Sequence, residues 1–172
     1  MKYEQVEGGS AAVFALKGET KILLGRNPRR RDPKWKLFAE TMKPGESILN
    51  TLLAGLTEEA GMTDIKTEMG ENGKVARFID PRIKGVVEFG EREWIASTRI
   101  PHWRHFFGVI TTDEVINRLS GETHIIEEED EVEEIQTMEF PLAMLETLGD
   151  SLLRPHAELI RSIPQRKVKE VG

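Results

Sequence analysis

The chain has 172 residues, which is enough for one compact domain with a sizeable hydrophobic core. Its 24 lysines and arginines against 30 acidic residues give a formal net charge of -6, and it contains no cysteine. The absence of cysteine excludes a disulfide scaffold, a thiolate nucleophile and cysteine-ligated metal sites. The acidic balance argues against a nucleic-acid-binding protein, because phosphate backbones attract net positive charge.

Membrane association and internal division are also disfavoured. The longest apolar run, Ala11–Leu16, is far shorter than the roughly 20 residues that span a bilayer. No apolar stretch typical of a signal peptide follows the first residues. We therefore expect a soluble cytoplasmic protein, with a single domain over residues 1–164 and a frayed polar tail over residues 165–172. The sequence leaves a homodimer open.

The first predicted element is a β-hairpin, in which Ala11–Leu16 and Lys21–Leu24 flank a polar turn. The stretch that follows, Arg26–Lys36, holds six basic residues and one acid, and its two prolines predict a loop. Leu37–Met42 is predicted to be a short extended segment.

The sharpest predicted element is a helix that begins after Ser47, whose hydroxyl can cap the first turn. Gly61 is expected to end this helix in the left-handed conformation. Between them, six apolar residues recur at helical spacing on one face. These residues are Ile48, Leu49, Leu52, Leu53, Leu56 and Ala60.

The remainder of the chain is predicted to be rich in strands with few helices. A short helix is expected at Asp113–Leu119, and two more at Pro141–Leu148 and Leu152–Ile163. This pattern, without regular βα alternation, predicts an α+β fold or a helix–sheet–helix sandwich. The predicted strands are Ile65–Met69, Lys74–Ile79, Val86–Phe89, Trp94–Ile100, Phe106–Ile110 and Ile135–Phe140.

Three carboxylates lie on or beside the helix: Glu46 before it, and Glu58 and Glu59 near its end. Mg²⁺ prefers oxygen ligands and needs only one or two carboxylates when waters and substrate phosphates complete its shell. Acidic residues near a helix C-terminus are slightly unfavourable with the macrodipole, so Glu58 and Glu59 are a mild anomaly at this position. The alternative is a solvated glutamate pair.

These residues resemble the box of the Nudix hydrolases, G-x5-E-x7-R-E-U-x-E-E-x-G-U, where U is aliphatic. Aligned on Glu58-Glu59 and Gly61, Glu46 matches the first box glutamate. The early hairpin and the late acidic segment also resemble this family, so the likeness covers residues 10–160. It implies an α/β/α sandwich with a mixed sheet, hydrolysis of a nucleoside diphosphate linked to another moiety, and a nucleotide substrate.

The resemblance also implies roles for single residues. Glu58 and Glu59 would be catalytic and would bind Mg²⁺ or Mn²⁺, whereas Glu46, Gly45 and Gly61 would support them.

Two departures from the box carry information. Ala54-Gly55 replaces its Arg-Glu pair, and Glu40 replaces its opening glycine. Glycine inside a helix costs about 1 kcal/mol relative to alanine, so a close approach at Gly55 should offset it. We hypothesise that Glu40 supplies the missing carboxylate to the metal from outside the helix.

Three further candidates lie outside the box. Residues 127–134 hold seven acids, of which Glu131 or Glu134 is expected to act as the general base, unless the run is a solvated loop. Arg26 is expected to bind substrate phosphate, although the basic loop equally suits surface charge. Trp103 is a candidate for stacking on a base, with partial cover of a core strand as the alternative.

Three functional interpretations remain open from the sequence. The first is a metal-dependent Nudix-type pyrophosphohydrolase, and the second is a Nudix-like module that binds a nucleotide or a protein without cleaving it. The altered pair Ala54-Gly55 favours the second. The third is an unrelated acidic α+β domain, which predicts no stabilisation by divalent cations.

Overall fold

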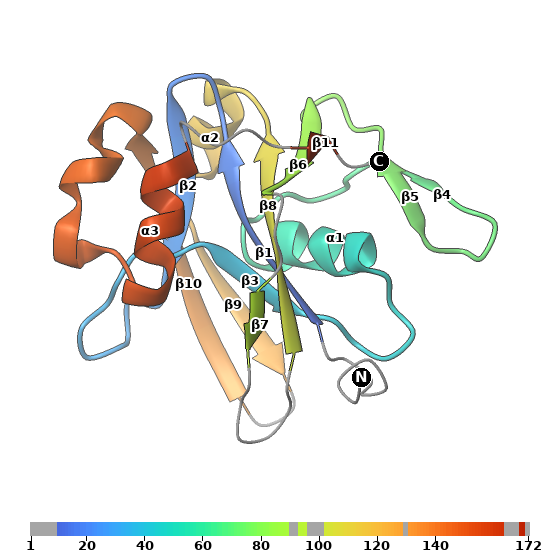
Figure 1. The fold of residues 1–172 in the computed structure, drawn as a ribbon, viewed down its shortest axis with the longest axis horizontal. Helices are drawn as coiled ribbons and strands as arrows, with labels where there is room; N and C mark the ends of the chain where they lie inside the picture. The colour runs from blue at the N-terminus through green and yellow to red at the C-terminus, as the bar shows by residue number, and fades with distance from the viewer. Residues whose placement is uncertain (1–9, 90–92, 96–101, 129–130, 164–168, 171–172) are drawn as a thin grey trace.

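The structure is a computed structural model that describes residues 10–89, 93–95, 102–128, 131–163 and 169–170. Within those ranges, nine strands form one mixed sheet and two more form a separate hairpin that projects from it (Figure 1). The helices are α1 Ile48–Glu58, α2 Asp113–Leu119 and α3 Arg154–Ser162, with 3₁₀ helices η2 Leu142–Thr147 and η3 Gly149–Ser151. None of these helices has the length and apolar character needed to cross a membrane.

The large sheet runs in the order β11-β6-β8-β1-β2-β10-β9, with β3 beside β1 and β7 beside β8. Its strands are β1 Ser10–Lys17, β2 Lys21–Arg26, β3 Phe38–Thr41, β6 Gly85–Glu88, β7 Glu93–Ile95, β8 His102–Ile110, β9 Thr123–Glu128, β10 Glu131–Pro141 and β11 Lys169–Glu170. The separate hairpin consists of β4 Thr67–Met69 and β5 Val75–Phe78.

Strand β1 organises the sheet. It runs parallel to β8 along its whole length, from Ser10 opposite Trp103 to Lys17 opposite Ile110. Its other edge is shared, because its first half pairs with β3 and its last residues pair with β2. The predicted hairpin of β1 and β2 is therefore confirmed, and β3 is brought alongside its start.

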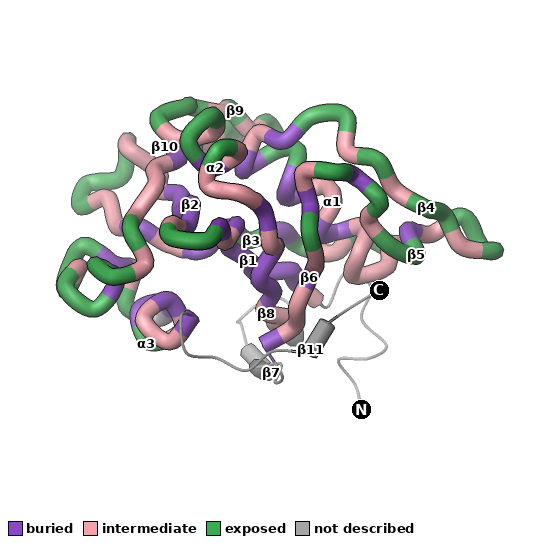
Figure 2. The backbone as a smooth tube through the Cα atoms, turned by 90° about the horizontal axis from the view of Figure 1, so that it is seen from above, coloured by how far each residue is buried: buried purple, intermediate pink, exposed green. Residues whose placement is uncertain are grey.

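Two buried clusters cover the two faces of the sheet. Phe14 and Leu23 on one face pack with Leu52 and Leu56 of α1 and with Ile116 of α2. The other face packs against η2 and α3. Figure 2 shows the buried strands between these helical layers, which confirms the predicted α/β/α sandwich with a mixed sheet.

Several predicted boundaries differ from the structure. Residues 127–128 and 131–134 lie on the paired strands β9 and β10, so the alternative of a solvated loop is wrong for them. The tail was expected to fray, yet Lys169–Glu170 pairs with β6. The segment predicted as a helix at Pro141–Leu148 forms the 3₁₀ helix η2. Of the predicted strand Trp94–Ile100, the first two residues lie on β7, and the rest lies outside the described residues.

Candidate functional site

The site begins in the turn that leads into α1. Gly45 has φ +81°, a conformation that glycine adopts without strain, and the turn closes through a hydrogen bond from the Glu46 N–H to the Lys43 carbonyl oxygen. One carboxylate oxygen of Glu46 accepts hydrogen bonds from the Lys43 N–H and the Thr51 hydroxyl, each at 3.2 Å. Ser47 caps the helix as predicted, accepting from the Asn50 N–H. Glu46 therefore fixes the entry to α1.

The end of α1 separates its two glutamates. Gly61 has φ +84°, and the Met62 N–H bonds to the Leu56 carbonyl oxygen at 2.9 Å, which closes the last turn as predicted. Glu58 is exposed, whereas Glu59 is only 4% exposed. The helix end therefore directs Glu59, and not its neighbour, toward the sheet.

Gly55 lies where α1 closely approaches the sheet. A Cβ placed on it would lie 2.7 Å from the ring of Phe14 and 3.3 Å from the Cβ of Glu40. Glu40 is 6% exposed and belongs to β3, where it pairs with Ala12. The side chain of Glu40 thus starts beside the place where a side chain at position 55 would start. Glu59 lies one helical turn further along the same face.

The electrostatics couple these two carboxylates. Burial, and after it the negative charge of Glu40, are the main causes that raise the pKa of Glu59 to about 8. Lys36 and a hydrogen bond from the backbone of Ala39 lower it, whereas Glu133 raises it. Oε2 of Glu59 is buried and has no hydrogen-bond partner among the described residues. A buried carboxylate of this kind favours either a proton or a cation at this point.

The donor set suits a hard divalent cation, because two carboxylates can hold Mg²⁺ when waters and phosphate oxygens complete the shell. The unpartnered Oε2 of Glu59 is the observation that supports this fit. Within the described part of the chain, no group of three or more acidic or histidine side chains converges to bind a metal. The predicted set of Glu40, Glu58 and Glu59 therefore stays a prediction.

A pocket of about 290 Å³ is lined in part by charged residues that act on Glu59, although neither Glu59 nor Glu40 lines it. Its charged lining residues are the cations Arg30, Lys34 and Lys36 and the acids Asp32 and Glu133. Lys36 and Glu133 are the two lining residues whose charges act on Glu59. Neither residue was a predicted site residue, although strand alternation from the buried Ile135 places Glu133 on the face that α1 covers.

Two of the predicted residues lie on the opposite face of the sheet from α1. Arg26 donates to Gln136 at 2.9 Å and stacks over Trp35 with its guanidinium carbon 4.4 Å from the ring centroid. Glu134 forms an ion pair with Arg29 at 3.0 Å. Because neighbouring residues of a strand face opposite ways, Glu133 and Glu134 cannot serve the same site.

The last two candidates lie on strands whose side chains at these positions are outside the described part. Trp103 is opposite Ser10 in β8, and Glu131 is opposite Glu128 at the start of β10. Their roles stay predictions.

Comparisons with known proteins concern the fold. A hydrolase of the NUDIX family from Clostridium perfringens superposes with a TM-score of 0.50 at 10% identity, over 90% of this chain and 95% of its own. An ADP compounds hydrolase gives a TM-score of 0.56 at 13% identity, over 91% of this chain and 71% of its own. A NUDIX hydrolase from Nitrosomonas europaea gives 0.54 at 13% identity, over 94% and 93%.

No family model and no curated protein sequence matches this chain. At these identities the superpositions establish the architecture, and the chain has the Nudix fold that its sequence resemblance implies.

Proposed function

We propose that the chain is a divalent-metal-dependent hydrolase of a nucleoside diphosphate linked to another moiety, with Glu40 and Glu59 as its metal-binding pair. One observation carries the proposal. Gly55 stands at the position of a glutamate in the family's box, and the side chain of Glu40 on β3 begins beside it. A strand residue thereby replaces a helix residue at the same point. The Nudix fold of the chain supports this assignment.

In this proposal, acidic residues hold the cation and basic residues bind the phosphate. Glu40 and Glu59 would hold Mg²⁺ or Mn²⁺, which when bound polarises a phosphate oxygen and makes water more acidic. Lys36, Lys34 and Arg30 line the pocket of about 290 Å³ and would bind the phosphate oxygens, which disperses the charge that develops during displacement.

A proton acceptor is also needed. Glu133 lines the same pocket and its charge acts on Glu59, so its carboxylate would take up the proton of the attacking water. This assignment replaces Glu134, which is paired with Arg29 on the other face of the sheet. Glu131 remains the sequence-based alternative. Glu58, exposed at the end of α1, would act only at the outer side of the site.

The test is turnover with Mg²⁺ or Mn²⁺ on a panel of ADP-ribose-like, NADH-like, dinucleoside polyphosphate and nucleoside triphosphate substrates. Chromatography of the mononucleotide products measures the rate. We expect Glu59→Gln and Glu40→Gln each to lower the rate more than about a hundredfold, because even outer-shell partners of metal sites contribute ten- to a hundredfold. Glu114→Gln, an exposed acid on α2, is the matched control.

Thermal unfolding gives an independent readout. A cation that binds only the folded chain raises Tm in proportion to the logarithm of its concentration, and Glu59→Gln should abolish this increase. Absence of both turnover and metal-dependent stabilisation would refute the proposal. Nucleotide binding without turnover would instead favour the non-catalytic module, for which Ala54-Gly55 in place of the box Arg-Glu is the supporting feature.

A further inference from the structure

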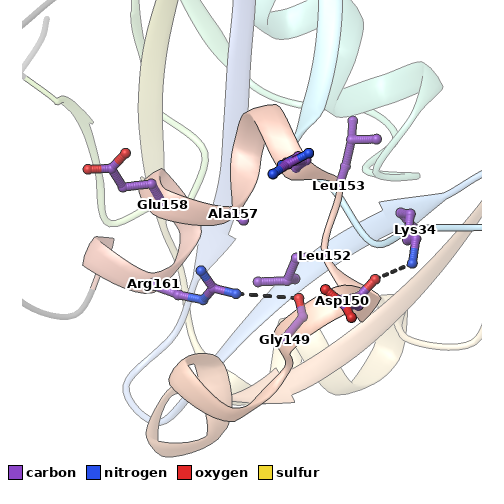
Figure 3. Close-up of a pocket in the computed structure, with 9 residues that line it drawn as sticks. Lys34, Gly149, Asp150, Leu152, Leu153, Ala157, Glu158 and Arg161 are labelled. Carbon is purple, nitrogen blue, oxygen red and sulfur yellow. Dashed lines mark hydrogen bonds between the residues drawn. The ribbon is translucent and has the colours of Figure 1, made fainter.

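A second pocket lies on the face of the sheet opposite α1, between η3 and α3 (Figure 3). Its volume is about 710 Å³, within the roughly 300–1,000 Å³ that small-molecule sites occupy. Leu152, Leu153 and Ala157 give it an apolar lining, and the first and last of these are buried. Such a lining suits the flat or apolar body of a ligand.

Arg161 is the feature of this pocket that points to an anion. Its Nε is buried and has no hydrogen-bond partner among the described residues, and its Nη2 donates to the Gly149 carbonyl oxygen at 3.4 Å. Figure 3 shows the guanidinium extended from α3 toward Gly149. A buried N–H of a charged group is costly when it lacks an acceptor, so an anion beside Nε would stabilise this arrangement.

The other charged residues leave the pocket cationic. Arg154 and Lys34 also line it, against the acids Asp150 and Glu158. Lys34 is held by a hydrogen bond to the backbone oxygen of Asp150 and an ion pair with Asp32 at 3.3 Å. Glu158 is exposed, and its carboxylate points away from the loop that carries Gly149 (Figure 3).

Several of the lining residues lie along one face of α3. Arg154, Ala157 and Arg161 recur at intervals of three and four residues, so they lie along one face of the helix. The Cα atoms of the two arginines are separated by about 10 Å at 1.5 Å rise per residue. An apolar residue between two cations matches a ligand with a phosphate at one end and a planar body beside it.

We propose that this pocket is a second ligand site for a phosphate monoester with a flat apolar body, of the nucleoside monophosphate class. Arg161 binds the phosphate through Nε and Nη, and Leu152 and Ala157 contact the body. The site is distinct from the carboxylate pair, although Lys34 and Leu153 line both pockets.

The experiment is calorimetric titration of the full chain with AMP, in EDTA so that no cation contributes. We expect Arg161→Gln to weaken AMP binding by at least about tenfold, because a charged hydrogen bond is lost. Arg161→Lys keeps the charge without the Nε donor and should weaken it less than Gln does. Inorganic phosphate should bind more weakly than AMP, because it makes no contact with the apolar lining.

Controls separate this site from the one beside Glu59. Arg118→Gln, which changes an exposed arginine on α2, should leave AMP affinity within twofold of the unmodified chain. If Arg161→Gln fails to fold, the exposed Arg154→Gln replaces it. Absence of AMP binding to the unmodified chain, or loss of affinity in Lys36→Gln and not in the Arg161 variants, would overturn the proposal.

Discussion

Replacing Gly55 by alanine tests the close approach on which the proposed metal pair depends. In an open helix this change stabilises by about 1 kcal/mol. Here the new Cβ would lie 2.7 Å from the ring of Phe14, which is fully buried and packs against Phe38 with ring centroids 5.3 Å apart. Relieving such overpacking costs about 1–3 kcal/mol. We therefore expect Gly55→Ala to destabilise the chain by about 1 kcal/mol.

A double-mutant cycle identifies the cause. Phe14→Leu removes the ring, so Gly55→Ala in that background should recover its helix-propensity gain, giving a coupling of at least about 1 kcal/mol. Urea unfolding followed by tryptophan fluorescence measures each free energy of unfolding, in EDTA. Ala54→Gly, one residue earlier in α1, calibrates the propensity effect of this helix. Equal stabilisation by Gly55→Ala in both backgrounds would refute the packing argument.

Three further predictions concern stability. The pKa of His156 is lowered to about 4 by burial and by the charges of Arg104 and Lys36, so the unfolded chain binds a proton below pH 6.5 that the folded chain does not. Stability should thus fall by roughly 3 kcal/mol from pH 7 to pH 4, relative to His156→Asn, in denaturant unfolding at each pH. Gly61→Ala should cost more than about 2 kcal/mol in the same assay, because φ is +84° and the new Cβ would lie 2.5 Å from the ring of His124; a loss below 1 kcal/mol would contradict this. Hydrogen bonds to the Arg82 side chain hold the pKa of Asp80 well below its usual range, so Asp80→Asn should cost about 2 kcal/mol at pH 7 and progressively less as the pH falls below about 4.

Local patterns in the sequence predicted the elements that carry the site. Ser47 caps the start of α1, and Gly61 follows its end in the left-handed conformation. Both could be predicted because these signals depend only on neighbouring residues in the chain. The extended segment containing Glu40 was also predicted, and the expectation that something must approach Gly55 closely is confirmed by Phe14. These features follow from short-range geometry.

The faces of the sheet could not be predicted in the same way. The prediction for Arg26 rests on its loop lying just upstream of the helix, and that for Glu134 on the local resemblance of the acidic run to the family. Strand alternation places both side chains on the face away from α1. The direction of the Lys36 side chain could not be predicted from the sequence, because Lys36 belongs to a predicted loop. In the structure it is fixed by the pairing of Lys36 with Gly25. Which of two adjacent acids enters a site depends on register, and register depends on partners distant in the chain.

The two carboxylates of the proposed metal pair come from different elements, which bears on the cation that they would select. In a helix, the spacing of two ligands is set by the helical repeat, whereas Glu40 belongs to β3 and Glu59 follows α1. The gap between them is therefore set by the height at which the helix rests on the sheet, and the Phe14 ring beneath Gly55 acts as the spacer. Since Mg²⁺ requires oxygens at 2.0–2.1 Å and Ca²⁺ accepts longer distances, the packing of the hydrophobic core would determine which cation this carboxylate pair prefers, if the pair holds a cation as proposed.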